Sequence, residues 1–152
     1  MRGVFHTGVT VSSLDTAIPF YRDVLGLKLV KGPSDTNSGD ALSEGVGVPG
    51  AAIRVAMFDA GDGSLSLELL EYLSPPSPID EPMPPNALGA AHLAFRVEDI
   101  EAKVAELSQK GVKFNGAIQV IDEGPLTGMH WVYFRDPDGS TLELIETDER
   151  FA

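Results

Sequence analysis

The sequence predicts an α+β fold built from two similar β-α-β-β-β modules. An internal repeat is the first observation, because residues 65–71 (LSLELLE) and 139–146 (GSTLELIE) are nearly the same. Both stretches begin at an Asp-Gly-Ser signal for a turn, at 62–64 and 138–140. The second observation is that each stretch ends a segment whose pattern is strand, helix, then three strands. The third is a proline-rich segment at 74–89 between the two halves.

The composition is that of an acidic domain with an interior of its own. The 152 residues are 43% hydrophobic and carry a net charge of -12, and the chain contains no basic run, so we expect no nucleic-acid surface. No apolar run approaches the ~20 residues of a membrane span, so no membrane segment is expected. The chain has no cysteine, which excludes disulfides and thiolate metal sites and leaves His, Asp and Glu as metal ligands.

The N-terminal residues have the pattern of a strand. Because no charged leader precedes an apolar core there, we expect an unprocessed, cytoplasmic protein. At this length the chain fits a single domain spanning residues 1–152.

The first module spans about residues 3–73. Alternating side chains predict a strand over 4–11, and Ser12 or Ser13 can then cap a helix. Pro19 lies inside this helix and predicts a kink or a late start. The remaining segments are expected to be a short strand at 27–30, a Gly- and Ser-rich loop at 32–50, and strands at 52–60 and 64–73.

A connector and a second module follow. Residues 74–89 hold six of the eleven prolines, a composition that favours a semi-rigid, extended connector. The second module, about residues 90–147, would pair its sheet with that of the first. Its expected elements are a strand at 91–97, a helix over 98–109, strands at 112–114, 118–123 and 130–134, and a final strand through Glu146.

Four candidate metal ligands occupy matching positions in the two modules. His6 and His92 lie on the strand before each helix, whereas Glu68 and Glu143 lie on the last strand of each module. Side-chain alternation places each of them on the smaller or more polar face of its strand, opposite the apolar face that packs on a helix. A lone histidine or glutamate on a strand is usually structural or solvated, so the hypothesis depends on the agreement of all four. Two imidazoles and two carboxylates suit a divalent ion such as Zn, Ni, Co, Mn or Fe, whose charge offsets the burial of the glutamates.

Three further residues are candidate substrate contacts: Tyr72, Arg96 and His130. Tyr72 shares the face of Glu68. Arg96 shares the face of His92 and can hold a carboxylate in a bidentate contact, or form an internal ion pair instead. His130 is either a substrate contact or acid/base group, or a histidine at a strand edge.

The alternation also makes predictions outside the site. Glu71 and Glu146 fall on the opposite faces from Glu68 and Glu143, and we expect both to be solvated. Core positions rather than ligand contacts are expected for three aromatic residues: Phe58, Trp131 and Phe134.

These residues and their spacing resemble the vicinal oxygen chelate superfamily, which includes glyoxalase I, methylmalonyl-CoA epimerase, extradiol dioxygenases and bleomycin- or fosfomycin-resistance proteins. The resemblance implies paired β-α-β-β-β modules in a curved, cup-like mixed sheet with the helices outside, and often a homodimer. It also implies metal ligands at His6, Glu68, His92 and Glu143, with open positions for two neighbouring substrate oxygens. The matching segments are FHT at 5–7, PFYRDVLGL at 19–27, LELLE at 67–71, AHLAF at 91–95, DPDG at 136–139 and LELIE at 142–146.

Individual members of this superfamily match the sequence to different degrees. Glyoxalase I uses the same His, Glu, His, Glu set, but tends to carry an arginine for glutathione where this chain has Thr10. Methylmalonyl-CoA epimerase has an additional catalytic glutamate near the position of Gly50, where the nearest acid of this chain is Glu44. Extradiol enzymes use two histidines and one glutamate, which makes Glu68 a surplus ligand. Resistance proteins of the bleomycin type bind their drug without a metal.

The first functional hypothesis is a metal-dependent lyase or isomerase of the glyoxalase or epimerase type, acting on a small substrate with vicinal oxygens. The metal would act as a Lewis acid on a carbonyl or enediolate, and Glu143 together with Glu68 would move the proton. The alternative is a non-catalytic protein that binds an antibiotic or metabolite in the same concavity and so confers resistance. A third hypothesis is an Fe(II)-dependent ring-cleaving dioxygenase.

Overall fold

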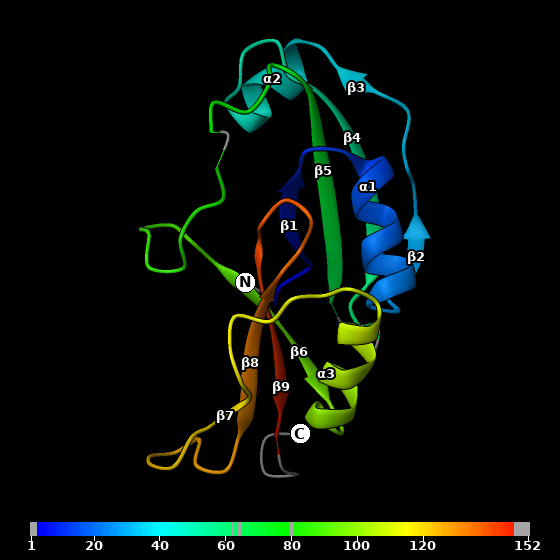
Figure 1. The fold of residues 1–152 in the computed structure, drawn as a ribbon. Helices are drawn as coiled ribbons and strands as arrows, with labels where there is room; N and C mark the ends of the chain where they lie inside the picture. The colour runs from blue at the N-terminus through cyan, green and yellow to red at the C-terminus, as the bar shows by residue number, and fades with distance from the viewer. Residues whose placement is uncertain (1–2, 62, 64, 80, 148–152) are drawn as a thin grey trace. The chain divides into compact units, whose positions relative to one another are not determined.

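The chain folds into two compact units, Met1–Asp80 and Glu81–Ala152, each with a mixed sheet and a covering helix (Figure 1). The computed structural model describes residues 3–61, 63, 65–79 and 81–147. The boundary between the units falls inside the proline-rich segment at 74–89. This arrangement confirms the predicted α+β class. No helix in the described part of the chain is long and apolar enough to cross a membrane.

The first unit has a sheet with the strand order β1-β5-β4-β2, and the short strand β3 pairs with β4. β1 runs parallel to β5, and the other pairs are antiparallel. The elements in chain order are β1 (His6–Val11), α1 (Leu14–Pro19), the π-helical turn η1 (Phe20–Val24), β2 (Lys28–Lys31), β3 (Asn37–Ser38), α2 (Asp40–Val46), β4 (Ala52–Asp59) and β5 (Ser66–Ser74).

The second unit repeats this connectivity without counterparts of β3 and α2 in its described residues. Its strand order is β6-β9-β8-β7, with β6 parallel to β9 and the other pairs antiparallel. The elements are β6 (His92–Val97), α3 (Ile100–Gln109), β7 (Gln119–Val120), β8 (His130–Arg135) and β9 (Thr141–Glu146). Each half therefore contains the predicted β-α-β-β-β order.

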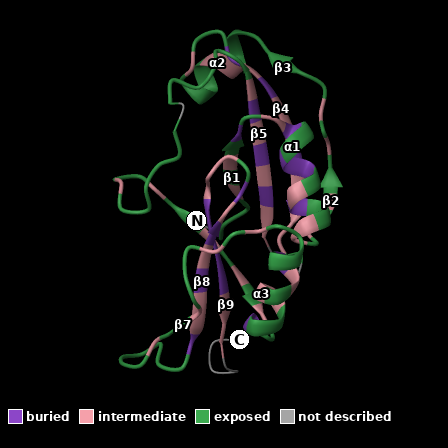
Figure 2. Ribbon diagram, viewed as in Figure 1, coloured by how far each residue is buried: buried purple, intermediate pink, exposed green. Residues whose placement is uncertain are grey.

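A helix covers one face of the sheet in each unit. In the first unit Ser13 caps α1, because its hydroxyl accepts a hydrogen bond from the Asp15 N–H. The apolar face of β5 and its neighbours then packs on this helix, and along β5 buried residues alternate with partly exposed ones (Figure 2). The fully buried side chains of this core include Leu14, Tyr21, Phe58, Leu67 and Leu69.

The second unit builds its core in the same way. Asp99 caps α3, because its carboxylate accepts a hydrogen bond from the Ala102 N–H at 2.8 Å. The buried residues on the covered face are Ile100, Leu107, Val132, Phe134, Leu142 and Leu144. In both units the other sheet face is the one that carries the histidine and glutamate of the repeat.

Two segments differ from the expected secondary structure. Residues 32–50, expected to be a loop, contain β3 and α2. α2 has no side-chain cap and buries none of its residues, so it has no apolar stripe that a periodicity could reveal. Residues 112–114, expected to be a strand, contribute only a bridge between Phe114 and Phe134.

Pro19 changes the first helix in the way that its chemistry requires. Proline has no N–H for the helical hydrogen-bond ladder and its ring crowds the preceding turn. The α-helix ends at Pro19 and continues as the π-helical turn η1, in which the Leu25 N–H donates to the Phe20 carbonyl. The predicted kink is therefore a change of helix type.

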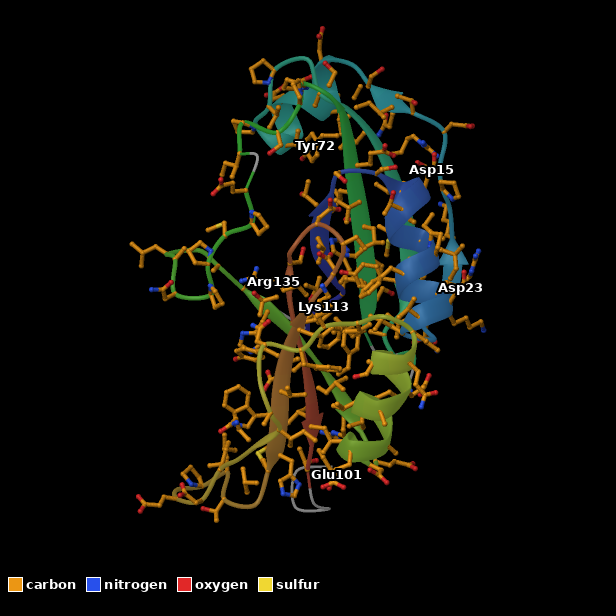
Figure 3. All side chains as sticks on the ribbon, viewed as in Figure 1. Asp15, Asp23, Tyr72, Glu101, Lys113 and Arg135 are labelled. Carbon is orange, nitrogen blue, oxygen red and sulfur yellow. The ribbon has the colours of Figure 1, made fainter. Side chains whose placement is uncertain are left out.

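Glu71 is buried, which corrects the expectation that it is solvated. It faces α1, and its side chain is only 10% exposed. Its Oε2 makes no hydrogen bond and lies 3.4 Å from Nη1 of Arg54, the residue directly opposite on β4. Arg54 in turn lies 3.9 Å from the carboxylate of Asp15, which projects from α1 (Figure 3). The helix excludes water from this face, so Arg54 stabilises the carboxylate instead.

Glu146 is also held by the protein rather than solvated. Its Oε2 accepts a hydrogen bond of 2.7 Å from the Ile100 N–H, one of the helix N–H groups that have no partner within α3. Its Oε1 lies 3.5 Å from Nδ1 of His130, the residue opposite on β8. The repeat thus places a second, structural glutamate on the helix side of each sheet.

Replacing Arg54 tests the role of the Arg54–Glu71 pair. Arg54→Ala leaves a buried carboxylate without its partner, so the free energy of unfolding in urea should fall by about 3 kcal/mol, the lower end for a broken buried pair because Arg54 is 24% exposed. The matched control is Arg22→Ala, which removes an exposed ion pair with Asp23 and should change stability little. Equal, small effects of the two substitutions would contradict a stabilising role for Arg54.

Candidate active site

The parallel pairing of β1 and β5 brings the first histidine and glutamate together. His6 is the partner of Ser66, so Glu68 lies two residues farther along the neighbouring strand, opposite Gly8. Nε2 of His6 is 3.5 Å from Oε2 of Glu68. Both side chains keep part of their surface exposed, 40% for the histidine and 21% for the glutamate.

The second unit repeats this arrangement at the same strand offset. His92 is the partner of Thr141, and Glu143 lies two residues along β9, opposite Ala94. Nε2 of His92 is 3.1 Å from Oε2 of Glu143, whose side chain is only 10% exposed. The repeat predicted from sequence therefore produces two His–Glu pairs with the same register.

Small residues leave room for each glutamate. The residue opposite Glu68 is Gly8, and the one opposite Glu143 is Ala94. A Cβ on Gly8 would lie 3.9 Å from the Glu68 carboxylate and 3.2 Å from Cδ1 of Leu70. A larger side chain at either position would therefore compete with the glutamate for the space beside the histidine.

A fixed turn precedes each glutamate-bearing strand. Before β9, the Asp136 carboxylate accepts hydrogen bonds from the N–H groups of Asp138 and Ser140. Gly139 has a φ of +85°, and a Cβ there would collide with Pro82, so glycine is required. Before β5, Asp59 accepts from Gly61 and Gly63. The rest of the predicted first turn, Asp62 and Ser64, lies outside the described residues.

Burial makes the carboxylate of Glu143 more basic than an exposed carboxylate. Desolvation raises the pKa of Glu143, and the charge and hydrogen bond of His92 offset part of that shift. On the adjacent strand, burial and the charge of Glu143 raise the pKa of the Tyr133 phenol. The second His–Glu pair therefore lies in a less solvated setting than free side chains in water.

Each unit by itself offers two donors to a metal. Imidazole nitrogen and carboxylate oxygen are donors that borderline divalent ions accept, so the chemistry of both pairs fits such an ion. Within the described residues, however, no group of three or more His, Asp or Glu side chains converges. The four-ligand site predicted from sequence thus remains a prediction, and its two halves are the His–Glu pairs.

The other predicted site residues lie at different distances from these pairs. Arg96 is on the same face of β6 as His92, next to Ile145 of β9. Tyr72 shares the face of Glu68 but is four residues along β5, about 13 Å away, near the end of the strand beside α2 (Figure 3). His130 lies on the opposite face of its sheet from Glu143.

His130 belongs to a pocket at the start of α3. The pocket has a volume of about 440 Å³ and contains Glu98, Asp99, Glu101 and Glu146 besides His130. Because the sheet separates this pocket from the His92–Glu143 pair, we leave His130 out of the site around that pair.

Two aromatic residues beside Glu143 were not predicted as site residues. Tyr133 lies opposite Glu143 in the register, and Trp131 lies one alternation farther along β8. Trp131 was expected in the core, but it is partly exposed on the face of the His–Glu pair, whereas Phe134 is fully buried as predicted. The alternation of Trp131 and Tyr133 with Val132 and Phe134 was the available signal.

Comparisons with known proteins found a matching family, similar sequences and a similar fold. A sequence model of the family described as Glyoxalase/Bleomycin resistance protein/Dioxygenase superfamily matches residues 3–144. The 2-epi-5-epi-valiolone epimerase of Actinomyces sp is 37% identical over 145 residues, 93% of this chain and 78% of that protein. A lactoylglutathione lyase of Haemophilus influenzae is 28% identical over 145 residues, 94% of this chain and 91% of the other. The crystal structure of a glyoxalase family protein from Bacillus cereus has a TM-score of 0.79 at 28% identity, covering 97% of this chain and 95% of that one.

The burial of Glu143 predicts a pH-dependent cost to the metal-free protein. The folded-state pKa of Glu143 is raised above its ordinary value of 4.5. Ionisation of Glu143 therefore opposes folding as the pH rises above that value and has no effect well below it. Glu143→Gln should therefore raise the melting temperature of the metal-free protein at neutral pH, and the difference should vanish in acid. The comparison is the same substitution at Glu68, whose side chain is 21% exposed against 10% for Glu143. A lower melting temperature for Glu143→Gln at neutral pH would contradict this account.

Proposed function

The chain belongs to the Glyoxalase/Bleomycin resistance protein/Dioxygenase superfamily, and from this we propose that it is a divalent-metal-dependent isomerase or lyase that transfers a proton next to a carbonyl group. Its relatives include an epimerase and lactoylglutathione lyases. The observation that carries the proposal is the His–Glu pair that occurs in both units at the same strand offset. In both units the pair also lies on the sheet face away from the covering helix, outside the packed core.

The four side chains of the two pairs are the proposed ligands of one divalent ion, Zn, Ni, Co, Mn or Fe. This requires the pairs to meet, either within one chain or between the two copies of a homodimer. Two imidazoles and two carboxylates would leave open positions for a substrate that has vicinal oxygens. When bound, the ion would act as a Lewis acid on a carbonyl group of the substrate.

Glu143 is the proposed base. Its raised pKa brings its basicity closer to neutral pH, where a general base is most effective. Its carboxylate would take the proton from the carbon next to the carbonyl, and the electron pair of the C–H bond would move toward the carbonyl oxygen. In the metal-free protein Nε2 of His92 lies 3.1 Å from this carboxylate and holds it on the site face of the sheet.

Glu68 is the proposed second proton carrier. Return of a proton to the opposite face of the same carbon gives an epimer, and return to the neighbouring carbon gives an isomer. In either case one C–H bond breaks and one forms, so the reaction needs no oxidant and no second substrate. Two carboxylates from two different units suit this exchange of a proton between two positions.

Metal binding by single-histidine variants tests whether both pairs serve one ion. Zinc-loaded wild-type protein should retain about one ion per chain after dialysis without chelators. His6→Ala and His92→Ala should each lower the zinc affinity by about 100-fold or more, since loss of even an outer partner costs about 10–100-fold. The matched control is His130→Ala, the remaining histidine of the chain, which should bind zinc as the wild type does.

The half-site variants also show how the proposal can fail. If His6→Ala keeps the wild-type affinity, the first unit does not contribute to the ion. If the wild type retains no zinc and binds none on titration, the metal-dependent proposal is wrong for this chain.

Solvent-deuterium exchange tests the role of Glu143. Zinc-loaded protein is mixed in D2O with 2-epi-5-epi-valiolone or lactoylglutathione, the compounds that appear in the names of the relatives. The carbon-bound protons are followed by NMR. Glu143→Gln should slow the exchange by about 10²–10⁴-fold, the usual contribution of a general base. The metal content of each sample is measured, so that loss of the base is separated from loss of the ion.

Glu146→Gln is the matched control for this experiment, because Glu146 lies three residues along the same strand on the opposite face. It should exchange at the wild-type rate. Undiminished exchange in zinc-loaded Glu143→Gln would rule out Glu143 as the base. If the wild type binds a probe tightly but exchanges no proton with either, the non-catalytic binding function replaces the enzymatic one.

A further inference from the structure

The two His–Glu pairs have the same residue types on their own strands, but the third strand beside them, β4 or β8, carries different residues. On β4 the residue opposite Glu68 is Met57, whereas on β8 the residue opposite Glu143 is Tyr133. One alternation farther along, Val55 of the first unit corresponds to Trp131 of the second. The first unit forms its His–Glu pair with no aromatic residue at these two positions of β4, although the Phe5 ring lies 5.5 Å from that of His6. The two rings of β8 are therefore not needed to hold a pair. Their presence requires another explanation.

The rings of the second unit form a continuous row beside the His–Glu pair. The centroid of the Tyr133 ring lies 5.2 Å from that of His92 on one side and 5.0 Å from that of Trp131 on the other. These distances are in the favourable range for aromatic pairs, and the ring planes are tilted by 46° and 59°. A ligand can therefore stack on the face of one ring while the next ring borders it. Since His92 is on β6 and Tyr133 on β8, the contact crosses β9, the strand that carries Glu143.

The row keeps aromatic surface available to a ligand. Val132 and Phe134, which alternate with these rings, are 2% and 0% exposed and pack on the α3 side. Trp131 and Tyr133 remain partly exposed on the face of His92. Sites for small molecules combine aromatic walls with a few polar groups that fix the orientation of the ligand.

Polar side chains lie at both ends of the strand row that contains Trp131. Across the sheet this row has Arg96 on β6, Ile145 on β9, Trp131 on β8 and Gln119 on β7. The order is polar, apolar, aromatic, polar. A ligand with flat apolar faces and polar groups at its edge matches that order, whereas an open chain would leave most of the aromatic surface uncovered.

We propose that Trp131 and Tyr133 form an aromatic platform on which a ring-shaped hydroxy ketone stacks, with its two oxygens directed toward the His92–Glu143 pair. The assignment rests on the proposed function and adds the shape of the substrate. Trp131 is the residue that determines specificity for a ring, and it acts by direct contact with the substrate. Tyr133 contributes its ring to the platform and also packs on His92.

The fluorescence of Trp131 tests the platform directly, because it is the one tryptophan of the chain. Two probes with six carbons and the same functional groups are compared: 2-hydroxycyclohexanone, a ring, and 4-hydroxyhexan-3-one, an open chain. The zinc-loaded protein is titrated with each. The ring should change the tryptophan emission and bind about tenfold more tightly than the open chain, because it has less conformational freedom to lose on binding.

Variants at position 131 separate the platform from the metal site. By calorimetry, Trp131→Leu should weaken binding of the ring probe about tenfold, and Trp131→Phe should retain most of it. The zinc content of both variants should be unchanged, since Trp131 lies one alternation away from Tyr133, the residue opposite Glu143. Val120→Ala, on the opposite face of the same sheet, is the matched control and should bind like the wild type.

The outcomes distinguish this inference from the proposed function. Equal affinity for the two probes, or an unchanged affinity of Trp131→Leu, overturns the platform even if the zinc and exchange experiments succeed. A change of oligomeric mass in Trp131→Leu without a change in probe affinity also overturns it and makes the rings an interface between copies. If the protein binds no zinc, the ring probe still changes the emission of the wild type and Trp131→Leu weakens binding of the probe by calorimetry, the platform stands and the metal-dependent function fails.

Discussion

The parallel pairing of the first and last strands is the constraint on which each unit depends. It places β1 beside β5 and β6 beside β9, so that each histidine lies two residues from a glutamate on the neighbouring strand. The helix that connects the module's strands covers one sheet face with apolar side chains, which leaves the His–Glu pair on the other. A shift of one residue in the register between these two strands would move the glutamate to the helix side and destroy the pair.

The same constraint explains why each sheet has two kinds of glutamate. Glu68 and Glu143 lie on the face of the histidines, where a metal ion or a proton can reach them. Glu71 and Glu146, three residues along, lie on the helix side and are held by Arg54 and by the first N–H of α3. One short sequence, Leu-Glu-Leu-Leu/Ile-Glu, therefore supplies both a chemical group and an internal anchor in each unit.

Much of this architecture is predictable because the repeat and the alternation are strong local signals. The two modules, the parity of each strand and the four candidate donors all follow from them. α2 is not predictable, since its helix has neither a capping side chain nor a buried residue. The error at 112–114 has a similar cause: an apolar triplet indicates burial, and Phe114 reaches the sheet through a bridge without forming a strand.

The two errors in the site have different causes. Alternation correctly predicts that Glu71 lies on the other face of β5 from Glu68. Its solvent exposure, however, depends on α1, which is distant in sequence. Trp131 was assigned to the core because an aromatic residue usually is, although its parity with Tyr133 places it beside Glu143. Alternation gives the face of Trp131, whereas its neighbours on that face depend on the register between strands, which is fixed only in the folded sheet.

The central claim is that histidines from the two units bind the same ion, and X-ray absorption spectroscopy of the zinc-loaded protein tests it most directly. The multiple-scattering signal of imidazole counts the histidines on each zinc. The account predicts two imidazoles at a Zn–N distance of about 2.0–2.1 Å together with oxygen donors. A spectrum with one imidazole per zinc would contradict it, because each His–Glu pair would then act alone.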